Sequence, residues 1–164
     1  MSQQERRILT IYVDGASRGN PGTSGIGIYC INQDQKMVIN AGFTIGKHTN
    51  NQAEYLALVY ALFFLSKKLS PAQQMRYHLN IIADSQLLIK QMTGEYKIKD
   101  PTLKILAEII KKFCFYFECK FSHVLREFNT NADALANHGI DAHIIPEKDF
   151  QELLATHGVK LGLS

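Results

Sequence analysis

Three strand-like segments follow one another near the start of the chain, before any helical pattern begins. In residues 7–14, aliphatic side chains recur at every second position, which is typical of a strand with one buried face. Residues 22–31 and 37–46 are two further β-like runs, and the polar segment 32–35 between them predicts a hairpin connection. A chain that begins in this way forms adjacent strands first, and its later elements must pack on them or extend the sheet.

Strand-like and helix-like patterns alternate through the rest of the chain. The remaining segments are a helix over residues 51–69, a strand over 77–84 that leads directly into a helical start, an amphipathic helix over 103–113, a strand over 115–125 and a last core helix from Asn131. The predicted order is therefore β-β-β-α-β-α-α-β-α. Such an order favours an α/β domain in which helices pack on a mixed sheet.

Length and composition exclude several classes of protein. The 164 residues suit one domain, and the hydrophobic (46%) and charged (20%) fractions are those of ordinary globular proteins. The longest apolar run, residues 55–65, is shorter than the roughly 18 residues that a membrane span requires. No apolar secretory segment precedes the first strand. We therefore expect a cytoplasmic protein with no membrane contact.

The cysteines do not form a recognisable metal or disulfide pattern. Cys30, Cys114 and Cys119 are an odd number and contain no C-x-x-C pair, so we expect three reduced side chains. Because Cys114 and Cys119 are five residues apart in a strand-like region, we expect them to point to opposite faces.

Four carboxylates lie where predicted elements begin or end. Asp14 closes the first strand and Asp84 the fourth, so parallel pairing of these strands would bring both to one edge of the sheet. Glu54 and Asp133 lie in the first turns of two predicted helices. Divalent cations would relieve the repulsion within such a cluster, and an all-carboxylate set without His or Cys favours Mg²⁺ over Zn²⁺.

Each of these acids also has a structural interpretation. Glu54 and Asp133 lie near capping-box positions, Asp84 precedes Ser85 as an N-cap would, and Asp14-Gly15 is a common turn dipeptide. Caps and turns account for most acids at such positions when each is taken alone. Their joint placement weakens these interpretations without removing them.

Four segments closely resemble the signature segments of the type 1 ribonuclease H family. They occur in the order and at the approximate spacing of that family, and the likeness spans about residues 7–140. The segments are Asp14-Gly15-Ala16-Ser17-Arg18-Gly19-Asn20-Pro21-Gly22, Thr49-Asn50-Asn51-Gln52-Ala53-Glu54, Ala83-Asp84-Ser85-Gln86 and Asn131-Ala132-Asp133-Ala134-Leu135-Ala136.

The resemblance implies a ribonuclease H-like fold, with a mixed five-stranded sheet (three antiparallel and two further parallel strands) and helices on both faces. It also implies an endonuclease that cuts the RNA strand of RNA–DNA hybrids without sequence preference and leaves 5′-phosphate and 3′-hydroxyl ends. Asp14 would bridge two Mg²⁺ ions, for which Mn²⁺ is a possible substitute. Glu54 and Asp84 would hold the ion near the leaving group, and Asp133 the ion that carries the attacking water.

By the same resemblance, three groups of polar residues would contact the hybrid. The first would reach ribose 2′-hydroxyls, which distinguish RNA from DNA, the second would enter the minor groove, and the third would form part of a pocket for a DNA-strand phosphate. For Asn50 and Asn51, helix capping is the alternative role. The groups are, in that order, Ser17, Gly19 and Asn20; Asn50 and Gln86; and Thr49 and Asn51.

The chain departs from the fuller bacterial pattern of the family in two places. Residues 92–101 are too short for the lysine-rich helical protrusion of many relatives and offer only Lys97 and Lys99. The loop 126–129 lacks the histidine that many relatives carry, and Glu127 is a weak candidate to replace it. His48 lies near Glu54 in the sequence, but we expect it to be a surface residue of a loop and not a catalytic one.

We therefore expect a catalytic domain over residues 1–140 and a C-terminal extension over 141–164, whose apolar residues could cover the core or bind a partner. No protein partner is indicated. Two alternatives remain: a catalytically silent module that binds hybrids, and a nuclease of the same fold that acts on another RNA duplex.

Overall fold

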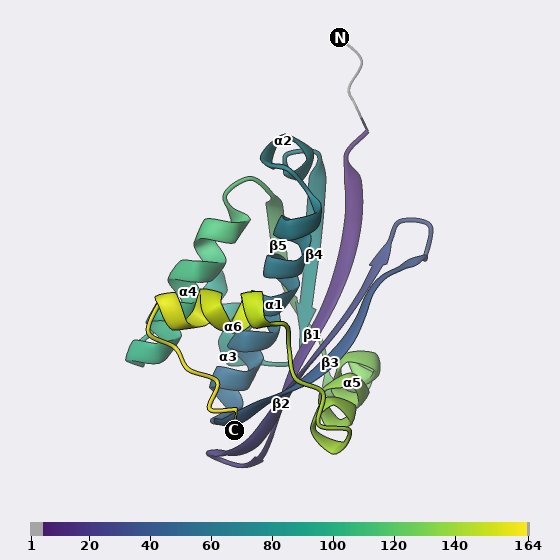
Figure 1. Ribbon diagram of the computed structural model, residues 1–164. Helices are drawn as coiled ribbons and strands as arrows, with labels where there is room; N and C mark the ends of the chain where they lie inside the picture. Colours follow the sequence, from purple (N-terminus) through teal and green to yellow (C-terminus); the bar gives the residue numbers. More distant parts are fainter. Residues whose placement is uncertain (1–4, 164) are drawn as a thin grey trace.

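The computed structural model describes residues 5–163, which form a five-stranded sheet with helices on both sides (Figure 1). The order in the sheet is β3-β2-β1-β4-β5. The pairs β1–β2 and β2–β3 are antiparallel, whereas β1–β4 and β4–β5 are parallel, which confirms the predicted mixed α/β sheet. The strands are β1 (Arg7–Gly19), β2 (Gly22–Asn32), β3 (Met37–His48), β4 (Tyr77–Ala83) and β5 (Glu118–His123).

Helix α1 (Asn50–Lys68) is the central helix of one face. It packs on β1 and β2 and contacts α3 and α4, while α5 packs on the other face against β1, β2 and β3 (Figure 1). A single turn, α2, connects α1 to β4, and a 3-10 turn, η1, leads into α5. The remaining bounds are α2 (Pro71–Gln74), α3 (Gln86–Met92), α4 (Pro101–Cys114), η1 (Arg126–Phe128), α5 (Thr130–Asp141) and α6 (Lys148–Thr156).

Helix α5 lies directly against the backbone of the sheet. A Cβ atom at Gly27 of β2 would collide with the carbonyl oxygen of Ala132, and one at Gly42 of β3 would collide with that of Leu135. Because both positions lack a side chain, the helix approaches the strands more closely than any other residue type would allow.

Strand β1 is longer than the sequence pattern predicts. It continues to Gly19 because the antiparallel pairing with β2 persists as far as Gly19 opposite Gly22. Asp14 therefore lies within a strand, opposite Gly27, and the prediction that it closes the strand is wrong. The parallel pairing with β4 ends at Tyr12, however, so Asp14 lies where its parallel neighbour has just ended.

The cysteine prediction is also wrong in part. Helix α4 continues to Cys114 and β5 begins only at Glu118, so the two neighbouring cysteines lie on different elements. Their Sγ atoms are 3.2 Å apart instead of on opposite faces. All three cysteines are free, as expected.

The segment beyond residue 140 contributes to the same core as the rest of the chain. Helix α6 lies in this segment, and its residues Phe150 and Leu154 are fully buried. Tyr60 of α1 donates a hydrogen bond of 2.7 Å from its hydroxyl to Glu147, which directly precedes α6. In the part of the chain that the structure describes, no helix is long and apolar enough to cross a membrane.

Candidate active site

Three of the four predicted carboxylates meet at one point of the sheet. Asp14 of β1, Glu54 of α1 and Asp84, which directly follows β4, each offer a carboxylate oxygen within 4.8 Å of the others. They line an open cleft of about 460 Å³, to which Asp133 of α5 and Arg126 of η1 also contribute. The fold therefore places acids from four separate parts of the sequence on one cleft.

Asp133 occupies the outer part of this group. Its side chain retains 32% of its exposure, and a carboxylate oxygen lies 3.4 Å from the guanidinium of Arg126. It lines the same cleft without belonging to the compact set of three oxygens. Arg126 is a basic residue that the sequence analysis did not identify, because a single arginine in a short loop has no distinguishing pattern.

The electrostatics of the cluster favour a bound cation. Burial raises the pKa of Asp14 to about 8, and the negative charge of Asp84 adds to the effect. Burial also raises the pKa of Glu54 well above its ordinary value, with Asp14 as the next cause. The Oε2 atom of Glu54 is buried and has no hydrogen-bond partner among the described residues. A buried carboxylate without a partner is unfavourable unless a proton or a cation compensates for its charge.

The helix caps are made by other residues. Thr49 is the N-cap of α1: its side chain accepts a hydrogen bond of 3.1 Å from the backbone N–H of Gln52, whose side chain accepts one of 3.1 Å from the N–H of Thr49. This capping box excludes the same role for Glu54, which lies further along the helix. Asn50 and Asn51 are helical residues and do not cap α1 either.

The structural alternatives for the other acids also fail. Ser85 caps α3 by accepting a hydrogen bond of 3.1 Å from the N–H of Leu88, so Asp84 is not the cap. Asp133 lies after the N-cap of α5, which is Asn129, and Asp14 is a paired strand residue instead of a turn residue. None of the four acids has the capping or turn role that its local sequence suggested.

The end of β1 and the connection to β2 are held against the start of α1. Ser17 donates a hydrogen bond of 3.0 Å to the carbonyl oxygen of His48, and the side-chain oxygen of Asn20 accepts one of 3.1 Å from the backbone N–H of Asn50. Gly19 has φ +100°, which favours glycine because it lies in the left-handed region.

The seven predicted substrate residues therefore come from three adjoining segments. Thr49 and Ser17 are partly buried, and the other five are exposed at the surface beside the carboxylates. Gln86 begins α3 two residues after Asp84. The five exposed residues are Gly19, Asn20, Asn50, Asn51 and Gln86.

Two buried polar residues support the site, and neither was identified from the sequence. Asn129 donates a hydrogen bond of 2.9 Å from Nδ2 to the carbonyl oxygen of Val13, which connects the start of α5 to the residue before Asp14. His48 is buried, contrary to expectation, and its Nε2 lies 2.8 Å from the carbonyl oxygen of Ile45 and 3.0 Å from that of Leu161. These contacts connect distant parts of the sequence, which is why local patterns do not indicate them.

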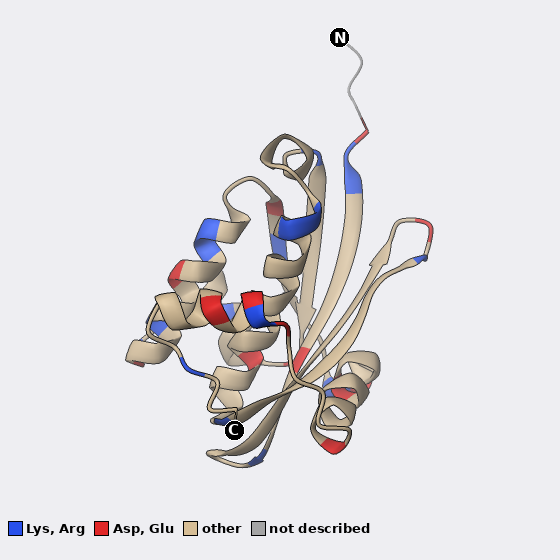
Figure 2. Cartoon of the chain, viewed as in Figure 1, with Lys and Arg blue, Asp and Glu red and all other residues tan. Residues whose placement is uncertain are grey.

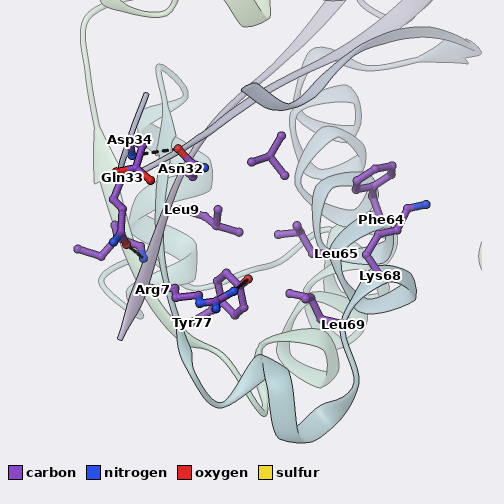
Figure 3. A pocket seen from close by; sticks show the side chains of 12 residues that line it. Arg7, Leu9, Asn32, Gln33, Asp34, Phe64, Leu65, Lys68, Leu69 and Tyr77 are labelled. Carbon is purple, nitrogen blue, oxygen red and sulfur yellow. Dashed lines mark hydrogen bonds between the residues drawn. The ribbon is translucent and has the colours of Figure 1, made fainter. Parts of the chain in front are cut away.

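A separate cavity of about 400 Å³ lies at the other end of β1 (Figure 3). Leu9, Leu65 and Leu69 form much of its wall, and Arg7 and Lys68 lie at its border. It contains no cluster of acids, and its distance along β1 from Asp14 separates it from the carboxylate cleft. The acids gather in the other cleft, which is lined mainly by polar residues.

Comparison with known proteins identifies the family of this chain. Residues 12–139 match the family described as reverse transcriptase-like. Over 132 residues the chain is 39% identical to Ribonuclease HI of Halobacterium salinarum; the match covers 79% of this chain and 63%, less than two thirds, of that protein.

Solved structures give the same relationship. RNase H1 from Halobacterium salinarum has a TM-score of 0.74 and 38% identity, covering 82% of this chain and 98% of that one. LC11-RNase H1, solved in complex with an RNA/DNA hybrid, has a TM-score of 0.74 and 37% identity, covering 82% of this chain and 97% of that one.

Proposed function

Because the chain belongs to the reverse transcriptase-like family and, within it, to the type 1 ribonucleases H, we propose that it hydrolyses the RNA strand of RNA–DNA hybrids. The observation that carries this proposal is the cluster of Asp14, Glu54 and Asp84, whose oxygens lie within 4.8 Å of one another beside exposed polar loops. Cleavage would be endonucleolytic and independent of sequence, and would leave 5′-phosphate and 3′-hydroxyl ends.

The donor set fits a hard divalent cation. All the candidate ligand atoms are carboxylate oxygens, which Mg²⁺ prefers, and Mn²⁺ would be an acceptable substitute. The unpartnered Oε2 of Glu54 is the atom that most requires such a cation. We propose two ions, with Asp14 shared between them, Glu54 and Asp84 on one and Asp133 on the other. When bound, the ions would stabilise the negative charge that develops on the phosphate oxygens during in-line displacement.

The residues of the chain would orient the substrate around these ions. Asn129 would keep α5, and with it Asp133, in position relative to β1 through its hydrogen bond to Val13. The exposed guanidinium of Arg126, 3.4 Å from Asp133, would supply a positive charge to a phosphate in the cleft. This places a cation in the short loop where the sequence offers no histidine.

Recognition of the hybrid would depend on the three segments beside the cleft. Ser17, Gly19 and Asn20 would contact ribose 2′-hydroxyls, and the hydrogen bond from Asn50 to Asn20 keeps this loop near the minor-groove pair Asn50 and Gln86. A pocket that includes Thr49 and Asn51 would receive a phosphate of the DNA strand. Single-stranded DNA or duplex DNA would lack the 2′-hydroxyl contacts.

Electrostatic attraction would make a modest contribution to binding. Figure 2 shows Lys and Arg residues distributed over several helices and strands. The segment between α3 and α4 is a short connection that carries Lys97 and Lys99. Each phosphate that is neutralised contributes about −0.9 to the slope of log K against log salt. We therefore expect a shallow slope, and a slope typical of six to ten contacts (about −5 to −9) would contradict this expectation.

Cleavage assays on four end-labelled substrates would test the proposed activity. The full chain should cut the RNA of an RNA–DNA hybrid with Mg²⁺, and should not do so with EDTA or when Asp84→Asn is used. Double-stranded RNA, single-stranded RNA and duplex DNA should remain intact. Cleavage of double-stranded RNA at a similar rate would support the other-duplex alternative, and hybrid binding without cleavage would support the silent module.

A further inference from the structure

Cys114 and Cys119 form a close sulfur pair on the part of the fold occupied by α4 and β5. The Sγ atoms are 3.2 Å apart, and the thiol of Cys119 donates a hydrogen bond to the sulfur of Cys114. Neither residue lines the carboxylate cleft. Both residues are partly exposed, in contrast to the third cysteine of the chain.

The position of each sulfur is set by regular structure. Cys114 is the last residue of α4, and the N–H of Phe117 donates a hydrogen bond of 3.1 Å to its carbonyl oxygen, which closes a tight turn. Cys119 lies in β5, in parallel register with Leu79 of β4. A helix end and a sheet ladder therefore hold the two sulfurs together, and the pair does not depend on the conformation of a free loop.

Cys30 provides an internal contrast. It is fully buried, and burial raises the pKa of its thiol to about 12, so it is unreactive near neutral pH. The hydrogen bond from Cys119 lowers the pKa of Cys114, against the opposing effect of burial, whereas the pKa of Cys119 is raised by the same hydrogen bond. Cys114 is thus suited to attack a disulfide reagent first, and Cys119 to resolve the resulting mixed disulfide.

A metal site is a poorer explanation of the pair. Structural zinc sites use four ligands. The one cluster of three or more His, Cys, Asp or Glu side chains found among the described residues is the carboxylate set at Asp14. With only two sulfurs available, the pair has the composition of a dithiol.

We propose that Cys114 and Cys119 are a reversible redox modification site, at which a low-molecular-weight disulfide converts the two thiols into an intramolecular disulfide. The thiolate of Cys114 attacks one sulfur of the reagent RSSR, forms a mixed disulfide and releases RS⁻. Cys119 gives up its proton, which RS⁻ takes to become RSH. The Cys119 thiolate then attacks the Cys114 sulfur and displaces the second RS⁻. This RS⁻ takes up from the buffer the proton that Cys114 released on ionising, and becomes RSH.

The balance is two protein thiols and one RSSR giving one protein disulfide and two RSH. A disulfide bond is about 2.05 Å long, so the sulfurs need to approach by only about 1 Å. The product would connect the end of α4 to the edge strand β5, and excess dithiol would reverse the reaction.

Oxidised glutathione and peptide mapping would test this proposal on the full chain. Trypsin releases residues 113–120 as one peptide that contains both cysteines. After oxidation and alkylation of the remaining thiols, this peptide should lack both alkyl groups and be about 2 Da lighter than its reduced form. Cys30 should be alkylated only after denaturation. Dithiothreitol should restore alkylation of both cysteines in the peptide.

Two single variants distinguish the order of attack. Cys119→Ser should accumulate a stable glutathione adduct at Cys114, because no second thiol resolves it. Cys114→Ser should form its adduct at Cys119 at least about tenfold more slowly, because burial still raises the pKa of the remaining thiol after the hydrogen bond to Cys114 is lost. The proposal is overturned if the wild-type peptide retains two free thiols, keeps glutathione without forming the internal bond, or cross-links between molecules instead.

Discussion

Helix α1 contributes to two regions with opposite effects on stability. Near its start, Glu54 brings a buried oxygen without a partner next to Asp14. Further along, Tyr60 and Phe63 pack on Phe150 of α6, with ring centroids 5.0 and 5.4 Å apart. The first region places repelling charges away from water, and the second buries aromatic surface. The comparison indicates that aromatic packing along this helix offsets the cost of the carboxylate cluster near its start.

Removing one charge from the cluster should have the largest effect on activity. Asp14→Asn should lower hybrid cleavage by several orders of magnitude, because it removes the proposed shared ligand of both ions. Thermal stability without metal should be equal to or above that of the parent, since a neutral amide needs no compensating cation. Hybrid binding should persist. Retention of more than a few per cent of the cleavage rate would contradict the proposed role of Asp14.

Removing aromatic surface from the second region should lower stability and leave the cleavage activity of the folded protein unchanged. Phe150→Ala should lower the free energy of unfolding by about 3–5 kcal/mol, the range for large-to-alanine changes in a core. Cleavage per folded molecule should remain close to the parent value at low temperature. Phe115→Ala is the matched control, because Phe115 is 78% exposed and its loss should change stability by less than about 0.5 kcal/mol. Equal losses in the two variants would show that α6 is not part of the core.

The pH dependence of metal binding would sharpen the comparison. The folded-state pKa of Asp14 is raised from 3.8 to about 8, so its contribution to stability is full below pH 3.8 and is lost as pH rises toward 8. Mg²⁺ binds the charged form and should therefore raise the melting temperature more at pH 8 than at pH 5. At a hundredfold excess over Kd the stabilisation would be about 2.7 kcal/mol. Phe150→Ala should keep this pattern and Asp14→Asn should largely lose it; a shift independent of pH in the parent would argue against the carboxylate cluster as the metal site.

The smallest expected change in stability comes from two substitutions near the start of α1. Gln52→Ala removes one half of the capping box and should lower the free energy of unfolding by about 1 kcal/mol or less, without changing the cleavage rate. Glu54→Gln should leave stability equal or slightly higher while cleavage falls by orders of magnitude. Calorimetry and cleavage rates of the two variants, measured side by side, would separate the cap from the site. Near-normal cleavage by Glu54→Gln would remove Glu54 from the metal site.

Much of the fold could be predicted because it is encoded locally. Alternating apolar residues indicate β1, and helical spacing indicates α1 and α4, so the order of elements and the mixed sheet follow from the sequence. Boundaries were less predictable: the end of β1 depends on pairing with β2, and β5 begins only at Glu118 because a turn with no glycine or proline follows α4. Such features are set by partners that a local pattern does not contain.

The candidate site was predicted from segments that resemble a known family, and its three central acids do lie together. The roles of these acids stay predictions. Asn129, Arg126 and the buried His48 were missed because each acts through a contact with a distant or non-periodic partner. In the same way, the likeness to the family ends near residue 140, but Phe150 lies in the core shared with the rest of the chain.

The glycines beneath α5 limit the movement of Asp133, although they lie outside the carboxylate cleft. Gly27 and Gly42 let the backbone of α5 rest on the backbone of the sheet, with no side chain between them that could adopt another rotamer. Asp133 belongs to that helix. Its position relative to Asp14 is therefore fixed by contact between main chains, which is more rigid than contact between packed side chains. Catalytic groups function within tolerances of about 0.5 Å, which is less than the displacement that a single methyl group would impose at either glycine. Two residues without side chains thereby limit how far Asp133 on α5 can move relative to Asp14 on β1.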